Sequence, residues 1–167
     1  SFDAKTRRRA LQELAQALRQ GKAPAAPLTG AVNVHVHTFF SFNYRDFSPS
    51  RVAWEARKAG LDVAGSVDFD VLDAMDEILG AGDLLDLRVT AAMETRVFMP
   101  GYGDLEINSP GEPGVSYFMV AGFAALPAQS SFAGTCLAGL RDQARRRNVE
   151  MLERLSAMVL IGLGLIY

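Results

Sequence analysis

The chain has 167 residues, of which 49% are hydrophobic and 22% are charged. These proportions are typical of a globular protein and exclude a wholly disordered chain, and the length suits one domain with a sizeable core. Its 17 basic and 19 acidic side chains leave a net charge of −2. This balance excludes a general electrostatic attraction to nucleic acid or to an anionic membrane.

Neither end of the sequence predicts a targeting or membrane segment. The arginines at positions 7–9 are not followed by an apolar stretch, so no secretory signal is expected. The uncharged stretch at 155–167 is shorter than the roughly 20 residues that a membrane-spanning helix needs. The single cysteine, Cys136, excludes an internal disulfide and is expected to be a small buried residue. We therefore expect a soluble, cytoplasmic protein.

The first predicted element is an amphipathic helix over residues 1–21. Its leucines recur on one face, Asp3 is a candidate N-cap, and Gly21 ends the pattern. Residues 22–30 contain two prolines and a glycine, which predicts a linker. The rest of the chain, residues 31–167, is expected to form the main domain.

Strands and helices then alternate along the chain. Valines at every second position predict a strand over 31–37, and Ser48 with Pro49 predicts the start of a helix that ends at Gly60. The next elements are a strand over 61–69, a helix over 71–85 and a strand over 87–99. This order is typical of a parallel α/β sheet or barrel, in which strands alternate with helices.

The second half of the sequence is less regular. A loop rich in Gly and Pro is expected over 100–113, and residues 115–123 are either a fourth strand or a buried helix. A long helix follows over 136–158, with apolar residues at helical spacing. Its arginines are interleaved with acidic residues, which indicates a solvated helix face rather than a nucleic-acid patch.

Ionisable side chains occur at or near the ends of the three predicted strands, where α/β folds carry their sites. They are His35 and His37, Asp68 and Asp70, and Glu94. Imidazoles and carboxylates are common metal ligands, so this set predicts a metal site. Two alternatives remain open. Glu94 could simply pair with Arg96, or the two histidines could have no metal-binding role.

Three segments resemble the opening of a known family. They are "HVHTFFSF", "AGLDVAGSVDFDVLDAMDE" and "AAMETRVF". The sequence over about residues 31–99 is similar to the PHP (polymerase and histidinol phosphatase) family. That family's motifs are His-x-His-Thr-x-x-Ser-Asp, a Thr-Asp-His strand end after an Ala-Gly-Leu helix exit, and a strand ending in Gly-x-Glu. The resemblance implies a distorted (β/α)7 barrel with two or three divalent metal ions that activate water for phosphoester hydrolysis.

The sequence departs from the family pattern at two positions. Phe42 replaces the Asp after the motif Ser, and Phe69 replaces the His of Thr-Asp-His. Both replaced residues usually serve one metal position, so the resemblance implies that this position is absent. One or two ions of Zn, Mn or Fe are then expected.

The resemblance also implies that the sequence is incomplete. The family takes further histidines and an Asp-x-His from the second half of its barrel, whereas no histidine follows His37 here. We therefore expect the N-terminal part of a PHP-like barrel, preceded by its N-terminal helix. The apolar tail is expected to be covered by the missing half or by another subunit.

The function implied by the resemblance is that of a divergent metal-dependent hydrolase acting on a small-molecule phosphoester. The implied site residues are His35, His37 and Glu94 as metal ligands, Asp68 as a catalytic group that ligates the metal or orients a water, and Arg45 and Arg96 as phosphate-binding residues. The alternative is an inactive binding or interaction module with a vestigial metal site. The two phenylalanines and the missing histidines favour this alternative.

Overall fold

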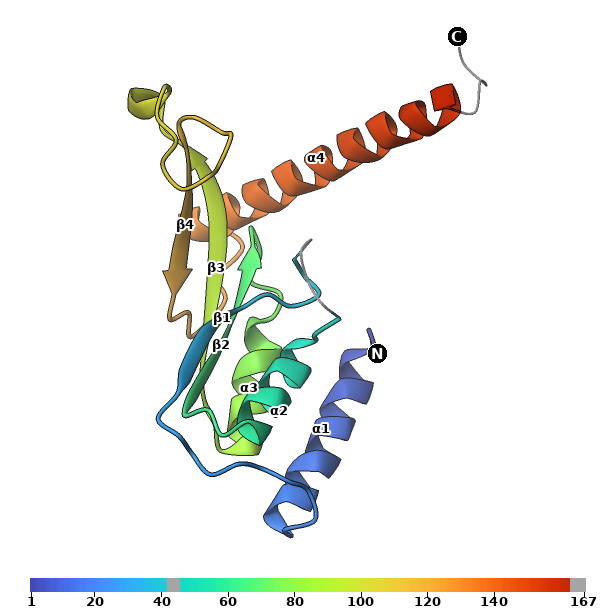
Figure 1. Ribbon diagram of the computed structural model, residues 1–167, viewed down its shortest axis with the longest axis vertical. Coiled ribbons are helices and arrows are strands. Elements are labelled where there is room, and N and C mark those ends of the chain that lie inside the picture. Colours follow the sequence, from blue (N-terminus) through green and yellow to red (C-terminus); the bar gives the residue numbers. More distant parts are fainter. Residues whose placement is uncertain (42–45, 163–167) are drawn as a thin grey trace. The chain divides into compact units, whose positions relative to one another are not determined.

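The computed structural model describes residues 1–41 and 46–162 (Figure 1). The elements in chain order are α1 (Ala4–Arg19), β1 (Val32–Val36), α2 (Pro49–Lys58), β2 (Val63–Phe69), α3 (Met75–Leu85), β3 (Arg88–Phe98), the 3-10 turn η1 (Pro100–Tyr102), β4 (Val115–Ala121) and α4 (Phe132–Gly162). They divide into two compact units, Ser1–Leu126 and Pro127–Tyr167. Among the residues described, no helix is long and apolar enough to cross a membrane.

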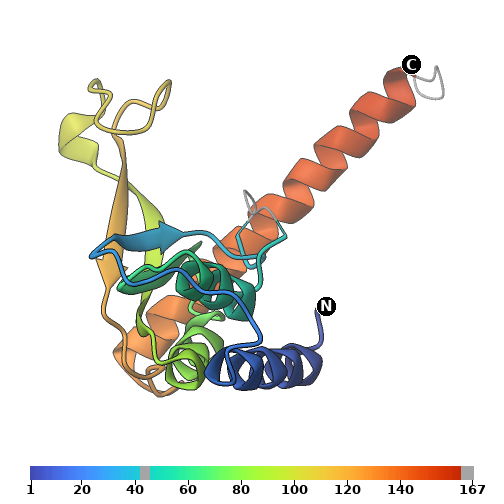
Figure 2. The ribbon, with the colours of Figure 1, turned by 60° about the horizontal axis from the view of Figure 1, so that its bottom comes forward.

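The first unit is a mixed α/β fold built on a curled sheet with the strand order β1-β2-β3-β4 (Figures 1 and 2). β1, β2 and β3 run parallel, as the alternation of strands and helices predicted. β3 is the longest strand and pairs with β2 along its first part and with β4 along its last part. The sheet is consistent with part of a barrel.

The fourth strand corrects the prediction of parallel strands alternating with helices. Residues 115–121 do form a strand rather than a buried helix, but β4 runs antiparallel to β3. The reason is the connection. A parallel strand needs a crossover, usually a helix, to return the chain to the same end of the sheet, whereas the Gly- and Pro-rich segment after β3 forms only η1 and turns. The chain therefore reverses direction at the end of β3.

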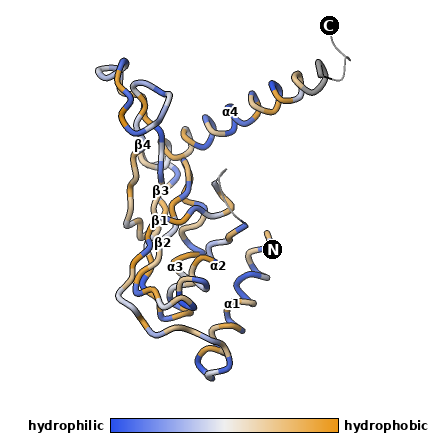
Figure 3. The backbone as a smooth tube through the Cα atoms, in the orientation of Figure 1, coloured by the Kyte–Doolittle hydropathy of each residue, from blue (hydrophilic) through white to orange (hydrophobic). Residues whose placement is uncertain are grey.

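Helices α2 and α3 lie on one face of the sheet, and α1 packs against their outer side (Figures 1 and 2). The core between these layers contains Val52 and Ala53 of α2, Ile78 of α3, and Ala91 of β3, all of them buried. Their burial supplies the main stabilisation of this unit, because each side chain is removed from water on folding. The strands and α3 include many hydrophobic residues (Figure 3).

Local signals in the sequence explain where the first two helices begin and end. The side chain of Asp3 accepts a hydrogen bond from the backbone N–H of Thr6, and Ser48 accepts one from Arg51, so both predicted N-caps are confirmed. Gly60 follows α2 with a φ of +76°, and a Cβ at this position would lie 2.2 Å from the carbonyl oxygen of Pro27. Only glycine fits this turn without displacing the segment before β1.

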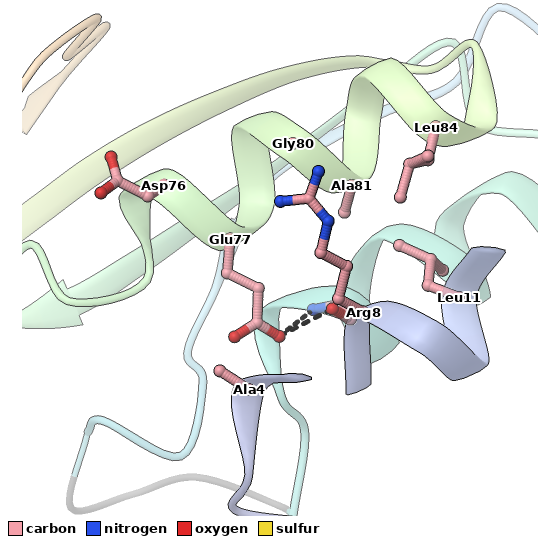
Figure 4. Close-up of a pocket in the computed structure, with 9 residues that line it drawn as sticks. Ala4, Arg8, Leu11, Asp76, Glu77, Gly80, Ala81 and Leu84 are labelled. Atoms are coloured by element: carbon pink, nitrogen blue, oxygen red, sulfur yellow. Dashed lines mark hydrogen bonds between the residues drawn. The ribbon is translucent and has the colours of Figure 1, made fainter. Parts of the chain in front are cut away.

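A partly buried ion pair that the sequence did not reveal joins α1 to the rest of the unit. Arg7 Nε donates to Glu77 Oε1 of α3 at 2.8 Å, and Ser50 of α2 donates to the same oxygen through its N–H and its hydroxyl. Glu77 therefore joins three helices. Beside it lies a cavity of about 230 Å³ between α1 and α3, with Arg8 and Leu11 on its α1 side (Figure 4).

We predict that Glu77 makes the stability of this unit depend on pH. Burial alone would raise the pKa of Glu77, but hydrogen bonds from Arg7 and Ser50 outweigh it, so the pKa lies below its usual value of 4.5. The unfolded chain therefore binds the proton more readily. The stabilisation is complete well above pH 4.5 and is lost as the pH falls through the folded-state pKa.

Glu77→Gln should lower the free energy of unfolding by about 2 kcal/mol at pH 7. It should also flatten the fall in stability on the acid side, as measured by urea unfolding at a series of pH values. Glu13→Gln is the matched control, because the Arg9–Glu13 pair of α1 is well exposed. A variant whose pH profile parallels that of the wild type would contradict this role of Glu77.

The second unit consists mainly of α4, which extends the predicted helix over 136–158 at both ends. Hydrophilic and hydrophobic residues alternate along the coloured part of this helix (Figure 3). Cys136 is exposed, so the expectation that it is buried was wrong. That expectation came from the residue type alone, since free cysteine is among the most often buried residues, and the position of Cys136 on α4 leaves it exposed instead.

Candidate metal centre

Two histidines and one glutamate converge on the face of the sheet opposite the helices. His35 Nε2 lies 3.3 Å from Glu94 Oε2, and His37 Nε2 lies 3.5 Å from the same oxygen. One ligand atom from each residue lies within 4.8 Å of the other two. The residues come from β1, from the position after β1, and from β3. The side chain of Glu94 is only 13% exposed, whereas that of His35 is 49% exposed.

Strand geometry explains why both histidines point the same way. Residues two apart on a strand share a face, and the residue between them faces the other side. Val36 and Ala64 line a cavity together with Val52 and Ala56 of α2, so this side of β1 faces the helices. His35 and His37 therefore face away from α2. The pairing of β1 with β2 also shifts register between Asn33 and Val36.

Ser41 fixes the orientation of His37. The Ser41 hydroxyl lies 3.2 Å from His37 Nδ1, accepts a hydrogen bond from the N–H of Phe69 at 3.1 Å, and donates to Asp68 Oδ1 at 2.7 Å. A hydroxyl has one proton to donate, and here the proton goes to the carboxylate. His37 Nδ1 must therefore carry a proton and donate it to Ser41. The lone pair of neutral His37 is then on Nε2, the atom that faces Glu94.

The electrostatic surroundings favour the neutral form of His37. Burial of the ring lowers its pKa below the usual value of 6.5, and the nearby Glu94 carboxylate offsets this effect only in part. A neutral imidazole with a free Nε2 is the form that binds metal ions. The hydrogen bond to Ser41 and the burial of the ring thus favour the form of His37 that can bind a metal ion.

Asp68 lies behind this group rather than within it. It is 1% exposed, and its carboxylate accepts hydrogen bonds from the N–H of Thr38 at 2.8 Å, from the Thr38 hydroxyl at 2.7 Å and from Ser41. These three donors occupy both carboxylate oxygens. Asp68 therefore holds the turn after β1, which carries His37, against the end of β2.

Phe69 occupies the position next to the three converging side chains where the resemblance would supply a histidine. Its ring is stacked on that of His37, with centroids 4.7 Å apart and planes 15° apart. Tyr117 of β4 contacts Phe69 in turn, with its ring centroid 5.9 Å from that of Phe69. A phenyl ring cannot ligate a metal, so Phe69 contributes an apolar wall.

The remaining predicted residues have different surroundings. Arg96 pairs with Glu112 of the loop between β3 and β4, whereas Glu94 faces the two histidines. Asp70 accepts a hydrogen bond from the Thr95 hydroxyl at 2.7 Å, and its N–H donates to the carbonyl of Glu94 at 2.9 Å. Asp70 thus supports the backbone of β3 beside Glu94. Phe42 and Arg45 lie outside the described residues.

The donor set fits a divalent metal ion. Ligand atoms around a four-coordinate ion such as Zn²⁺ lie roughly 3.4 Å apart, close to both distances from Glu94 to the histidines. Two imidazoles and one carboxylate suit Zn, Mn and Fe, and do not distinguish among them. The exposure of His35 leaves this side of the site open to water or substrate.

Comparison with solved structures found a similar chain, the crystal structure of a candidate metal-dependent phosphoesterase from Bifidobacterium adolescentis. The TM-score is 0.60, and the two sequences are 23% identical over the match. The match covers 79% of this chain and 40% of the other, so the present chain spans less than half of that neighbour's length. At this identity the likeness establishes the fold. Comparisons with protein-family models and with curated proteins found no match.

Proposed function

We propose that this chain is the N-terminal part of a PHP-type metal-dependent phosphoesterase. The observation that carries the proposal is the convergence of His35, His37 and Glu94 on one point at the end of the parallel strands. Two further observations support it, namely the sequence resemblance and the fold shared with a candidate metal-dependent phosphoesterase. The proposed substrate is a small-molecule phosphoester.

The proposed roles follow from the contacts of each residue. His35, His37 and Glu94 hold one divalent ion, which when bound polarises a phosphoryl oxygen and acidifies a water molecule. Ser41 and Asp68 keep His37 in the tautomer that presents Nε2. This assignment makes Asp68 a positioning residue. Arg96 and, among the residues outside the described part, Arg45 are proposed to bind anionic groups of the substrate.

A second candidate function is a binding module with a vestigial metal site. The stacking of Phe69 on His37 favours it, because an apolar ring stands where the resemblance would place another ligand. Such a protein would bind the ion and a phosphoester without turning it over. Hydrolysis therefore separates the two candidates, and metal binding does not.

The test is hydrolysis of a generic phosphoester by the protein loaded in turn with Zn²⁺, Mn²⁺ and Fe²⁺. We expect turnover with at least one ion, loss of turnover after treatment with a chelator, and recovery when the same ion is restored. Turnover should be slow, since three protein ligands leave coordination positions open to bulk water. Tight metal binding without turnover in any loaded form would favour the binding module.

A further inference from the structure

A strip of side chains borders the metal centre on the same face of the sheet. Phe69 is stacked on His37, Tyr117 meets Phe69 at an angle of 62°, and the Arg96 guanidinium carbon lies 5.8 Å from the centroid of the Tyr117 ring. The strand register brings these residues together, because Phe69 pairs with Glu94 and Arg96 pairs with Tyr117. Arg96 also shares a face of β3 with Glu94, two residues earlier, so the strip places two aromatic rings and a cation beside the metal ligands.

The cationic end of this strip already holds an anion supplied by the protein. Glu112 pairs with Arg96, and its carboxylate also accepts a hydrogen bond from the buried Ser109. Glu112 belongs to the loop that joins β3 to β4 and extends beyond the sheet (Figure 1). The side chains of Arg96 and Glu112 are 35% and 40% exposed. An ion pair so exposed is weak, so a ligand anion can displace Glu112 at little cost.

Tyr117 is held more firmly than the ion pair beside it. The side chain of Asn108 accepts a hydrogen bond from the N–H of Tyr117 at 2.8 Å and donates one to its carbonyl at 3.2 Å. The aromatic part of the strip thus has a fixed backbone, whereas its charged end can exchange partners. Fixed aromatic rings are suited to stacking with a planar group of a ligand.

We propose that Phe69, Tyr117 and Arg96 bind the organic part of a phosphoester that carries a planar ring and a second anionic group. Arg96 binds that second anion, and Glu112 occupies its place until the ligand arrives. This inference rests on the proposed function, because the phosphoryl group of the same ligand is assigned to the metal centre. It defines a substrate class, and it implies that Glu112 competes with the second anion of the ligand for Arg96.

Three non-hydrolysable probes separate the contributions of the strip. They are methylphosphonate, phenylphosphonate, and para-carboxyphenylphosphonate, which adds the second anion. Binding is measured by ligand-observed NMR and by calorimetry, with metal-loaded and with metal-free protein. We expect para-carboxyphenylphosphonate to bind about three- to fivefold more tightly than phenylphosphonate. Methylphosphonate should bind the most weakly of the three.

The variants should change affinity in opposite directions. Arg96→Gln should abolish the advantage of the carboxylated probe, whereas Glu112→Gln should increase it, and the double variant should behave as Arg96→Gln does. Tyr117→Leu should weaken both aromatic probes and leave methylphosphonate unchanged. Arg88→Gln is the matched control, since Arg88 lies at the other end of β3 and its side chain is 75% exposed.

The outcomes distinguish this inference from the proposed function. An Arg96-dependent preference for the carboxylated probe in metal-free protein supports the strip even if the loaded protein hydrolyses nothing. If the protein hydrolyses simple phosphoesters but neither its metal-loaded nor its metal-free form prefers the carboxylated probe through Arg96, the strip is not a binding site for the ligand. The proposed function would still stand. Equal affinities for the carboxylated probe in wild type and Glu112→Gln would overturn the competitor role.

Discussion

Replacing Glu94 by Gln should lower the affinity for a divalent ion by more than about 100-fold. Glu94 is the group that both histidines approach, and its loss leaves two of the three candidate ligands found among the described residues. Loss of a residue that merely supports a ligand typically costs 10- to 100-fold, so loss of the ligand itself should cost more. Elemental analysis of protein purified without chelator, followed by calorimetric titration with Zn²⁺ or Mn²⁺, measures the effect.

Thermal unfolding supplies a readout that does not depend on catalysis. An ion that binds only the folded protein stabilises it by about 2.7 kcal/mol when its concentration is 100 times the dissociation constant. This metal-dependent shift should be present in the wild type and absent in Glu94→Gln and His35→Ala. The melting temperature of the metal-free protein should change little in His35→Ala, because that side chain is half exposed.

Glu13→Gln is a suitable control for the charge change, since Glu13 lies on the exposed side of α1. It should bind metal as the wild type does. A wild-type protein that neither contains nor binds a divalent ion would refute the metal centre. So would a Glu94→Gln variant with wild-type affinity.

Elements with strong local signals could be predicted from the sequence. Asp3, Ser48 and Pro49 mark helix starts through contacts with residues a few positions away, and the structure confirms these starts. The alternation of valines before His37 predicted β1 because a strand repeats every two residues, although its hydrogen bonds are made to β2. In each case the signal lies within a short stretch of sequence.

The orientation of β4 and the partners of the charged residues depend on contacts distant in the sequence. Residues 115–121 carry no signal for a parallel or antiparallel orientation relative to β3, because the connection before the strand determines the orientation. Glu77 and Arg7 are likewise brought together only by the packing of α1 on α3. Composition could suggest that a buried Glu needs a partner, but it could not identify which arginine provides it.

The candidate site has some features that the sequence predicted and others that depend on contacts distant in the sequence. The two-residue spacing of His35 and His37 places them on one face, so their pairing was predictable, and Glu94 was identified as a charged residue in an apolar strand. The hydrogen bonds of Ser41 were not foreseen, although its position four residues after His37 was the available signal. Asp68 was predicted to ligate the metal or to orient a water molecule. In the structure its carboxylate accepts hydrogen bonds from three donors.

The enclosure of Asp68 leads to the second large expected effect. Asp68→Ala removes the acceptor for the Thr38 N–H, the Thr38 hydroxyl and the Ser41 hydroxyl, in a place that is closed to water. Each unsatisfied buried donor costs about 1 to 3 kcal/mol. The variant should therefore lose at least about 3 kcal/mol of unfolding free energy, or fail to fold.

Asp68→Asn keeps the test decisive, because an amide oxygen in the position of Oδ1 still accepts from Thr38 and Ser41. This variant should fold and lose about 1 kcal/mol in urea unfolding. Its metal affinity should stay close to that of the wild type. A direct metal ligand would behave differently, since the change from carboxylate to amide would then lower the affinity steeply.

Ser41→Ala isolates the step that connects Asp68 to the metal centre. Without the hydroxyl, His37 Nδ1 loses its bond to Ser41, so the tautomer that presents Nε2 is less strongly favoured. Metal affinity should fall about tenfold, which is the usual cost of removing the group that orients a metal-binding histidine. Ser116→Ala, at a buried serine of β4, should leave the affinity unchanged. Equal metal affinities in Ser41→Ala and in the wild type would show that the hydrogen bond to Ser41 does not prepare His37 as a ligand.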